Sequence, residues 1–465
     1  MRGIISSAGY VPYHRLAREA IGAAHGGSAG KGTRAVASYD EDTTSMGVEA
    51  ARLARRGQTA VPDALWFSTT TPSYADKTNA TTIHAALRLD RDVPAFDANG
   101  SIRSAAGVLR AALTGSGTTL VVTADARTGL PNSADEREGG DAASAALIGA
   151  GDDVIAEYLG GASTSEEFVD RWRVPGDPRS RQWEERFGEM RYVPLGTEAF
   201  KLGLDRAGVA PADVARVIVT GSHARAVKQV GTKVSAGTGG LADDLALTVG
   251  NAGAAHPLLL LAHALDAAEP GQVLALVVLS DGADVFFFRT TGAIATRSER
   301  RTVAHQLETG REGLLYTKFL AWKGLLQVQP PNRPEPNRAS SSAAARNEDW
   351  KYGFVGSQDR ESGAIHLPPA RVSYQGGHTD DMVAAPMADI TGTIVTFTVD
   401  RLAYSPSPPI VFAVVDFDGG GRVPIELTDV DVADVEIGGR VEMTFRRLNQ
   451  SDGIQNYFWK AKPVR

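Results

Sequence analysis

The sequence predicts an α/β region followed by a small all-β region. Over roughly the first 325 residues, short apolar runs typical of buried strands alternate with longer runs of helical periodicity. A stretch rich in Pro, Ser and Ala comes next, and beyond it short alternating segments are separated by Gly and Pro. With 465 residues, the chain is long enough for two or three domains that each have a core.

Composition limits the kinds of molecule that the chain is expected to bind. The formal net charge of -7 disfavours nonspecific binding to nucleic acids or anionic membranes. No segment approaches the roughly 20 apolar residues that span a bilayer, and residues 1–5 lead into a strand-like run with no signal peptide. The chain has no cysteine, which excludes disulfides and thiolate metal sites. We therefore expect a cytoplasmic protein with no membrane and no nucleic-acid partner.

The first half of the α/β region is expected to span residues 1–160. Strand-like apolar runs occur at residues 3–7, 63–68 and 119–124. A helix is expected to begin near Thr43, because acidic residues and a threonine satisfy the free N–H groups of a first turn.

A strand-to-helix turn is predicted at residues 96–102, where small residues separate a short apolar run from an Ala-rich helix. The free N–H groups at a helix N-terminus favour developing negative charge, so acyl-transfer enzymes place a nucleophile there. Ser101 is therefore a candidate nucleophile, although a hydroxyl needs an adjacent base, and its alternative role is a helix cap. Arg103 and Ser104 could contact a phosphate or carboxylate; Arg103 could equally be structural in a dimer contact.

The second half is expected to span residues 161–325. It opens with a charged, aromatic insertion at 161–194, either a surface excursion or a dimer or partner contact. A helix at 195–207 and a strand at 214–220 follow, and a bridging helix over 301–326 closes the half.

Two loops of this half carry polar candidates. His223 follows the strand that ends at residue 220, and Asn251 stands in a Gly-Asn-Ala-Gly sequence. Each has a structural alternative, a solvated histidine in one case and an asparagine that tolerates left-handed backbone in the other. His256 and His263, seven residues apart on one helical face, are expected in the core or an interface.

Residues 326–346 are expected to form an extended linker, because Pro-rich and then Ser/Ala-rich sequence cannot bury a core. Residues 347–385 form a separate small module. Residues 386–465 are expected to form a β-barrel, since alternating runs such as 393–399 and 411–417 are separated by Gly and Pro turns.

Three motifs carry a family resemblance. The Gly-Tyr-Val-Pro run at 9–12, the Tyr-Asp-Glu-Asp run at 39–42 and the turn within 97–109 resemble the 3-hydroxy-3-methylglutaryl-CoA synthases and ketoacyl synthases III of the thiolase superfamily. The resemblance implies a duplicated thiolase-like fold in five layers, αβαβα, and a homodimer. It also implies a coenzyme A thioester as substrate, with no bound cofactor.

The chain departs from this family at its reactive groups. The family carries an acylated Cys in the turn, and that position falls on the inert Ile102, or on Ser101 after a slip of one residue. The family's acid/base Glu lies where this chain has Thr71-Pro72-Ser73. We therefore expect the chain to be a pseudoenzyme with respect to covalent acyl transfer.

The family's remaining site residues are partly retained. Its His falls on Ser222, so His223 is offset by one position. Asn251 matches the Gly-Asn motif that in the family helps to hold the thioester oxyanion, and it is the best retained of the expected catalytic residues.

The module at 347–385 has the framework of a rubredoxin-like zinc ribbon. The four positions where ligands would stand are Asp359, Ser362, Ser373 and Gly376. Gly cannot bind a metal and Ser is a poor zinc ligand, so we expect a metal-free ribbon without zinc. His366 and His378 could in principle bind a metal, although exposed loop histidines are commoner. Ribbon and barrel together resemble the OB-fold acyl-CoA-associated proteins found beside thiolases.

These resemblances predict a subunit of a complex that forms or cleaves carbon–carbon bonds of acyl-CoA, with a separate Cys-bearing thiolase subunit supplying the covalent chemistry. The alternative is an autonomous acyltransferase, hydrolase or aldolase that uses Ser101 or His223. A nucleic-acid-binding OB module is a third possibility, which the acidic net charge disfavours.

Overall fold

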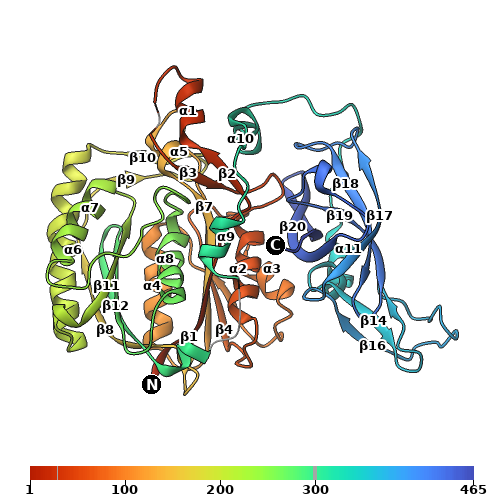
Figure 1. The fold of residues 1–465 in the computed structure, drawn as a ribbon, viewed down its shortest axis with the longest axis horizontal. Coiled ribbons are helices and arrows are strands. Elements are labelled where there is room, and N and C mark those ends of the chain that lie inside the picture. Colours follow the sequence, from red (N-terminus) through yellow and green to blue (C-terminus); the bar gives the residue numbers. More distant parts are fainter. Residues whose placement is uncertain (29, 297–300) are drawn as a thin grey trace. The chain divides into compact units, whose positions relative to one another are not determined.

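The structure is a computed structural model that describes residues 1–28, 30–296 and 301–465, and the chain divides into two compact units. Unit 1 comprises residues 1–37, 49–80 and 91–316. Unit 2 comprises residues 38–48, 81–90 and 317–465. Figure 1 shows the helices and strands of both units, and each unit is described by itself below.

A nine-stranded mixed sheet forms the centre of unit 1, in the order β11-β12-β13-β8-β1-β7-β6-β4-β5. Its strands are β1 (Arg2–Tyr10), β4 (Ala64–Ser68), β5 (Ala95–Asp97), β6 (Thr119–Ala126), β7 (Asp141–Ala150), β8 (Ala156–Ser165), β11 (Val214–Gly221), β12 (Val273–Leu279) and β13 (Gly282–Thr290). Strand β4 runs parallel to β5 and β6, and β11 runs parallel to β12. The predicted mixed α/β architecture is therefore confirmed.

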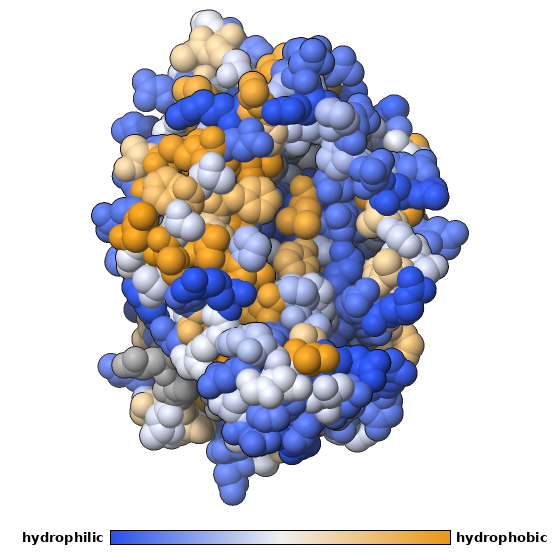
Figure 2. Space-filling view, turned by 90° about the vertical axis from the view of Figure 1, so that its right-hand side faces the viewer, coloured by the Kyte–Doolittle hydropathy of each residue, from blue (hydrophilic) through white to orange (hydrophobic). Residues whose placement is uncertain are grey.

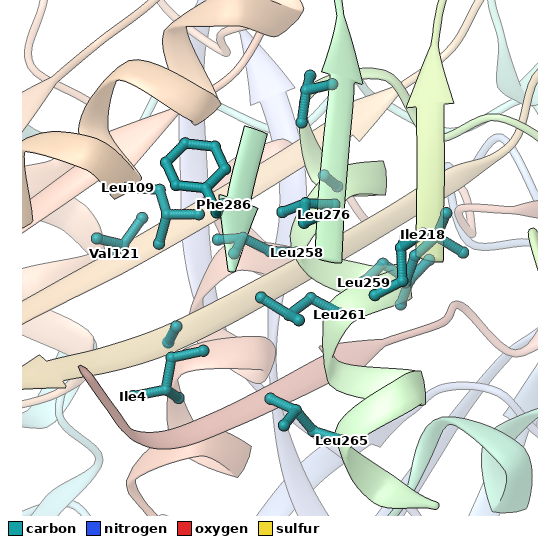
Figure 3. Packing of buried hydrophobic residues seen from close by; sticks show 14 of the residues in the cluster. Ile4, Leu109, Val121, Ile218, Leu258, Leu259, Leu261, Leu265, Leu276 and Phe286 are labelled. Atoms are coloured by element: carbon teal, nitrogen blue, oxygen red, sulfur yellow. The ribbon is translucent and has the colours of Figure 1, made fainter. Parts of the chain in front are cut away.

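Two helices pack between the two halves of this sheet. They are α4 (Ile102–Thr114) and α8 (His256–Asp266). Leu109 of α4 and Leu258 of α8 share one buried cluster with Val121 from the first half and Phe286 from the second (Figure 3). The apolar faces of both helices are thus buried by the two halves at once, which removes a large apolar area from water.

The other face of β11, β12 and β13 is covered by α6 (Glu185–Ala207) and α7 (Ala224–Val234). Helix α6 begins well before residue 195, so the predicted start of this helix was wrong. Pro194 lies inside the helix and removes one N–H donor. The carbonyl of Met190 therefore has no N–H donor within the helix. Because Met190 is exposed, water can donate a hydrogen bond to this carbonyl.

Shorter elements complete unit 1. They are β2 (His14–Ala17), β3 (Thr33–Val36), β9 (Arg171–Trp172), β10 (Arg181–Gln182), α1 (Arg18–Ala24), α5 (Ala134–Glu138) and α9 (Val303–Glu308). Two helices, α2 (Thr43–Arg55) and α3 (Ala80–Ala86), each pass from one unit into the other. The predicted helix start near Thr43 is confirmed.

The predicted bridging helix over 301–326 is two short helices, α9 and α10 (Tyr316–Trp322). Gly310 and Gly313 lie between them, and Gly313 has a φ of 84°, which an α-helix does not accommodate. The prediction of one continuous helix was therefore wrong.

Unit 2 consists mainly of β-structure. A three-stranded sheet contains β14 (Val355–Asp359), β15 (Ile365–His366) and β16 (Met382–Pro386). A closed five-stranded barrel follows, made of β17 (Gly392–Asp400), β18 (Ile410–Phe417), β19 (Arg422–Leu427), β20 (Arg440–Ser451) and β21 (Ile454–Pro463). The predicted C-terminal barrel is confirmed.

The predicted linker contains a helix that we did not expect. Helix α11 (Ser341–Arg346) lies within residues 326–346, and α12 (Glu348–Lys351) follows it. The hydroxyl of Ser340 accepts a hydrogen bond from the N–H of Ala343, and alanine has the highest helix propensity. Composition indicated an extended linker here, whereas local capping favours a helical turn.

Residues 38–48 belong to unit 2, and they contribute acidic groups to a buried ion network beside the barrel. The Nζ of Lys460 lies 3.0 Å from Asp40, and Arg446 lies 2.6 Å from Asp429 and close to Glu41. All five of these side chains are almost completely buried.

Hydrophobic and hydrophilic residues gather in separate patches on the face shown in Figure 2. The exposed apolar residues of unit 2 include Val372, Leu402, Phe412 and Ile437. Among the described residues, no helix has the length and apolar character needed to cross a membrane.

Candidate functional site

The turn between β5 and α4 has the predicted strand–turn–helix geometry. Gly100 has a φ of 125°, and its N–H donates to the carbonyl of Thr69, 3.3 Å away. Ser101 is the N-cap residue of α4, with extended backbone, and its side chain does not cap the helix. Ser101 thus stands beside the free N–H groups at the start of α4.

Ile102 lies in the first turn of α4 and is only 5% exposed. It belongs to the apolar cluster between the two halves of the sheet. Ser101 is only partly buried, and no residue of the described ranges hydrogen-bonds its hydroxyl. The turn therefore offers a hydroxyl without an adjacent base, and the neighbouring position faces the core.

Arg103 is engaged by the ends of β8 and β13. Its Nε lies 3.0 Å from Asp284, and its other nitrogens donate to the carbonyls of Asp281 and Thr164. The hydroxyl of Ser104 donates to the carbonyl of Asn99 over 3.4 Å. These contacts give Arg103 a structural role in linking α4 to two strands.

The loop after β4, where the family has its Glu, is held by the buried Asp125. Asp125 accepts hydrogen bonds from the hydroxyl of Thr69 at 2.9 Å, the N–H of Thr70 at 2.7 Å and the hydroxyl of Thr70 at 2.8 Å. It also accepts from the N–H of Ala254 at 2.6 Å. A Cβ atom on Gly253 would lie 2.0 Å from this carboxylate, so only glycine fits there.

The side-chain amide of Asn251 joins two loops. Its Nδ2 donates to the carbonyl of Gly221 at 2.7 Å, and its Oδ1 accepts from the N–H of Gly253 at 2.9 Å. One N–H and the carbonyl of the amide are thus taken up by backbone. This contact ties the loop after β11 to the loop before α8.

His223 is the N-cap residue of α7. Its Nδ1 accepts from the N–H of Ala226 at 3.1 Å, and its Nε2 lies 2.8 Å from the carbonyl of Glu185. A carbonyl can only accept, so Nε2 carries the proton and the ring is neutral. In this arrangement neither nitrogen is available to take a proton from Ser101.

Sequence reasoning missed a buried carboxyl group beside His223. A Cβ atom on Gly188 would lie 2.2 Å from Asp170 Oδ1 and 2.5 Å from His223 Cδ2, so both side chains crowd the same point. Burial raises the pKa of Asp170 and of nearby Tyr192, whose oxygen accepts from the N–H of Asp281. The available signal was an acidic residue that follows Phe168 and Val169 and stands two residues before Trp172.

Three arginines that the sequence analysis did not single out lie near the same loops. Arg171 makes two hydrogen bonds to Asp135, at 2.9 and 2.8 Å. Arg127 lies 4.0 Å from Asp135, and Arg173 donates to the carbonyl of Thr70. Burial and the neighbouring charge of Arg171 lower the pKa of Arg127 to about 10.

These contacts form a connected set at the carboxyl ends of β4, β6 and β11, where open α/β sheets commonly bind ligands. The set combines a helix N-terminus, a buried carboxyl group and an arginine cluster. Among residues 1–28, 30–296 and 301–465, no group of three or more acidic or His side chains is arranged to hold a metal ion.

In unit 2, two of the four predicted ligand positions, Asp359 and Gly376, lie against the imidazole of His378, and the N–H of Ser373 donates to the carbonyl of His378. Asp359 accepts from Nδ1 of His378 at 2.8 Å and from the hydroxyl of Ser362. A Cβ atom on Gly376 would lie 2.6 Å from the same imidazole. Hydroxyls, one carboxylate and a glycine do not make the tetrahedral donor set that zinc needs, so these residues do not fit a structural zinc ion.

Comparison with known proteins identifies relatives of both regions. Residues 384–446 match the family model described as the C-terminal OB-fold domain of ChsH2. The chain is 30% identical over 289 residues to a hydroxymethylglutaryl-CoA synthase of Aeropyrum pernix. The alignment covers 59% of this chain and 78% of that protein. It is 27% identical over 322 residues to the enzyme of Pyrococcus horikoshii, covering 66% of this chain and 90% of the relative.

Solved structures show the same fold. The structure of MvaS in complex with 3-hydroxy-3-methylglutaryl coenzyme A has a TM-score of 0.58 at 21% identity, covering 72% of this chain and 94% of that chain. The 3-oxoacyl-(acyl carrier protein) synthase III of Pseudomonas aeruginosa has a TM-score of 0.54 at 18% identity, covering 62% and 98%. The predicted thiolase-like fold and the predicted OB-fold are confirmed.

Proposed function

Because the chain belongs to the hydroxymethylglutaryl-CoA synthase family, we propose that it takes part in forming or cleaving carbon–carbon bonds of acyl-CoA compounds. Within that chemistry it acts as a subunit that lacks the covalent nucleophile. A separate thiolase subunit carries the reactive Cys, while this chain supplies a remodelled synthase-like site and an OB-fold arm.

The observation that carries this proposal is the loss of the nucleophile at an intact turn. The chain has no cysteine, and Ile102 packs into the core where the family's Cys would stand. The neighbouring Ser101 has no base, since the neutral ring of His223 is held at both nitrogens by backbone. An acyl-enzyme intermediate on this chain therefore lacks both of its usual participants.

Two further features support a partner. The OB-fold is of the ChsH2 type, and Phe412 on its strand β18 is 44% exposed. Exposed aromatic side chains are enriched where proteins bind one another. We place the thiolase contact on this part of the barrel, and we expect a homodimer through the synthase-like region. We also propose that the ribbon holds no zinc.

The test is purification of the tagged full chain from its own cells, followed by mass spectrometry and a thiolase assay. We expect a stoichiometric Cys-bearing thiolase and activity in the complex alone. We expect Phe412→Ser to reduce recovery of the partner, whereas Val61→Ser, which changes an exposed apolar residue of unit 1, leaves it unchanged. A lone homodimer that transfers or cleaves an acyl group, and stops on Ser101→Ala or His223→Ala, would contradict the proposal.

One observation favours the alternative of an autonomous acyltransferase, hydrolase or aldolase. Asp170 is a buried carboxyl group with a raised pKa beside His223, a setting typical of general acid–base groups. If the chain works alone, turnover by the purified homodimer will depend on Asp170.

A further inference from the structure

We propose that the side-chain amine of Lys351, in unit 2, is a nucleophile that binds aldehydes or ketones as a Schiff base. Lys351 is the last residue of α12, and every contact that carries this inference lies within unit 2. The inference goes beyond the proposed function, and it depends neither on an acyl-CoA ligand nor on a thiolase partner.

The first argument is that the helix carrying Lys351 is fixed against β21. Directly after α12, the carbonyl of Tyr352 accepts a hydrogen bond from Nε1 of Trp459 on β21, at 2.8 Å. The rings of Trp350 and Phe458 lie edge to face, with their centroids 5.3 Å apart. The amine is therefore held in one place, and because Lys351 is only partly buried, a small molecule can reach it.

The second argument is the hydrogen bonding of the amine. Nζ of Lys351 donates to Oδ1 of Asn456 at 2.6 Å and to the carbonyl of Tyr457 at 2.7 Å. An ammonium group has three N–H donors, whereas a neutral amine has two and a lone pair. Within residues 1–28, 30–296 and 301–465 the amine has no third acceptor. The ring centroid of Tyr352, at 5.6 Å, is near the limit of about 6 Å for a cation–π contact. The two acceptors therefore match the neutral amine, and its lone pair stays available.

The third argument is that the amine has no counter-charge. No carboxylate of the described residues forms an ion pair with Lys351, and the acidic side chains of its own helix, Glu348 and Asp349, are exposed. Burial lowers the pKa of Lys351 from its ordinary value of 10.5 to about 8. A larger share of this amine is therefore neutral at neutral pH than of an ordinary lysine.

Lys460, on the same strand as Asn456, has the opposite surroundings. Its Nζ lies 3.0 Å from Asp40 and also pairs with Glu426. Burial alone would lower the pKa of Lys460, but the charges of these carboxylates outweigh it and hold the pKa above its usual range. Lys460 is thus a structural cation, whereas Lys351 has the desolvated, unpaired amine that is typical of nucleophilic lysines.

The chemistry that this amine supports is imine formation. The lone pair of Nζ attacks the carbonyl carbon, a C–N bond forms, and a proton moves from nitrogen to oxygen. The carbinolamine then loses water to give the C=N bond, so amine and carbonyl compound yield imine and water without an oxidant or a reductant. Aldehydes and ketones are more electrophilic than thioesters, so we expect them to react here in preference to an acyl-CoA. Aldol-type cleavage of a carbon–carbon bond releases compounds of this class.

The test is reductive alkylation of the full chain with propanal and sodium cyanoborohydride at pH 7. Cyanoborohydride transfers a hydride to the imine carbon, so each Schiff base becomes a stable N-propyl-lysine that peptide mass spectrometry locates and quantifies over time. We expect Lys351 to be alkylated at least about tenfold faster than the exposed Lys228 of α7. A rate at Lys351 equal to or below that at Lys228 would overturn the inference.

Two variants with the same change of charge test whether the surroundings of the amine cause its reactivity. Asn456→Asp places a carboxylate beside Nζ and stabilises the ammonium form, so alkylation of Lys351 should slow to about the rate of Lys228. Asn337→Asp adds its charge in the exposed linker and should leave the rate unchanged.

Circular dichroism checks that both variants are folded. Fast alkylation of Lys351 that persists in folded Asn456→Asp would contradict the inference. If Asn456→Asp does not fold, the ratio of the two rates in the native chain decides alone.

These results are distinguishable from those that test the proposed function. Selective alkylation of a chain recovered without a thiolase would support the Schiff-base site and contradict the proposed function. Unselective alkylation of a chain recovered with its thiolase would contradict the Schiff-base site and support the proposed function.

Discussion

The imidazole of His378 lies against Gly376, where a Cβ atom would come within 2.6 Å of the ring. The ring thus fills the space between positions that would hold ligands in a zinc ribbon. Its Nδ1 lies 2.8 Å from Asp359, which is completely buried, and its Nε2 lies 3.0 Å from Glu361. The imidazole of His378 thus connects Asp359 and Glu361.

We predict that the protonated form of His378, and not a metal ion, stabilises residues 347–385. The hydrogen bond to Asp359 raises the pKa of His378, and hydrogen bonds from Ser362 and His378 lower that of Asp359. A raised histidine pKa gives stability that is complete below its unfolded value of about 6.5 and is lost as pH rises through the folded value. The Asp359 contribution is present above its unfolded value of about 3.9 and is lost in strong acid.

We expect His378→Gln to lower the midpoint of thermal unfolding by several degrees at pH 6 and by less at pH 9. Differential scanning calorimetry of the full chain with and without EDTA checks this. A midpoint that falls with EDTA in the native chain would show that a metal holds the ribbon instead.

Arg446 should be the most sensitive residue of unit 2. Burial alone would raise the pKa of Asp40, but the charges of Lys460 and Arg446 outweigh it and hold the pKa well below its usual range. Replacing Arg446 with Met leaves buried carboxylates without their cation, which costs about 3–5 kcal/mol of unfolding free energy. Urea unfolding followed by tryptophan fluorescence measures this loss. Arg422→Met, which breaks an exposed pair with Asp416, should have little effect.

The turn before α4 can be tested with single introduced cysteines. Because the native chain has no cysteine, no other thiol reacts with the labelling reagent. We expect Ser101→Cys to react with iodoacetamide at least about tenfold faster than Ile102→Cys, because the helix N-terminus favours the thiolate and Ile102 is buried. Intact-mass spectrometry over time gives both rates. Faster labelling at position 102 would mean that this position, and not Ser101, faces a ligand.

Asp170 should reduce stability at neutral pH. Its raised pKa means that ionisation costs more in the folded chain than in the unfolded chain, so stability falls as pH rises above about 4. Asp170→Asn should therefore raise the melting temperature at pH 7 by a few degrees and have little effect at pH 4. A lower melting temperature at pH 7 would indicate that the carboxylate is needed for packing.

Local patterns predicted much of the fold. Small residues after Phe96 and the Ala-rich run predicted the turn before α4, and alternation predicted the barrel strands. The start of α6 was predicted at residue 195, but the helix begins at Glu185 and includes Pro194. The hydrogen bond that Pro194 cannot donate is tolerated because the helix is exposed to water at Met190. Ser340 and the alanines after it form a helix where composition favoured a linker.

The candidate site was less predictable because its contacts join distant residues. No periodicity relates Asp135 to Arg171 or Thr70 to Arg173. The same holds for Asp40 and Lys460, which meet in the buried network of unit 2. The family motif pointed to Asn251 and His223, but only the structure shows that backbone groups engage both side chains.

The most direct test of the central proposal is the intact mass of this chain after incubation with acetyl-CoA, measured alone and in the complex purified from its own cells. We expect its mass to remain unchanged in both samples, while the acetyl group appears on the cysteine of the thiolase partner. A stoichiometric acetyl adduct on this chain, mapped to Ser101, would contradict the proposal that it lacks a covalent nucleophile.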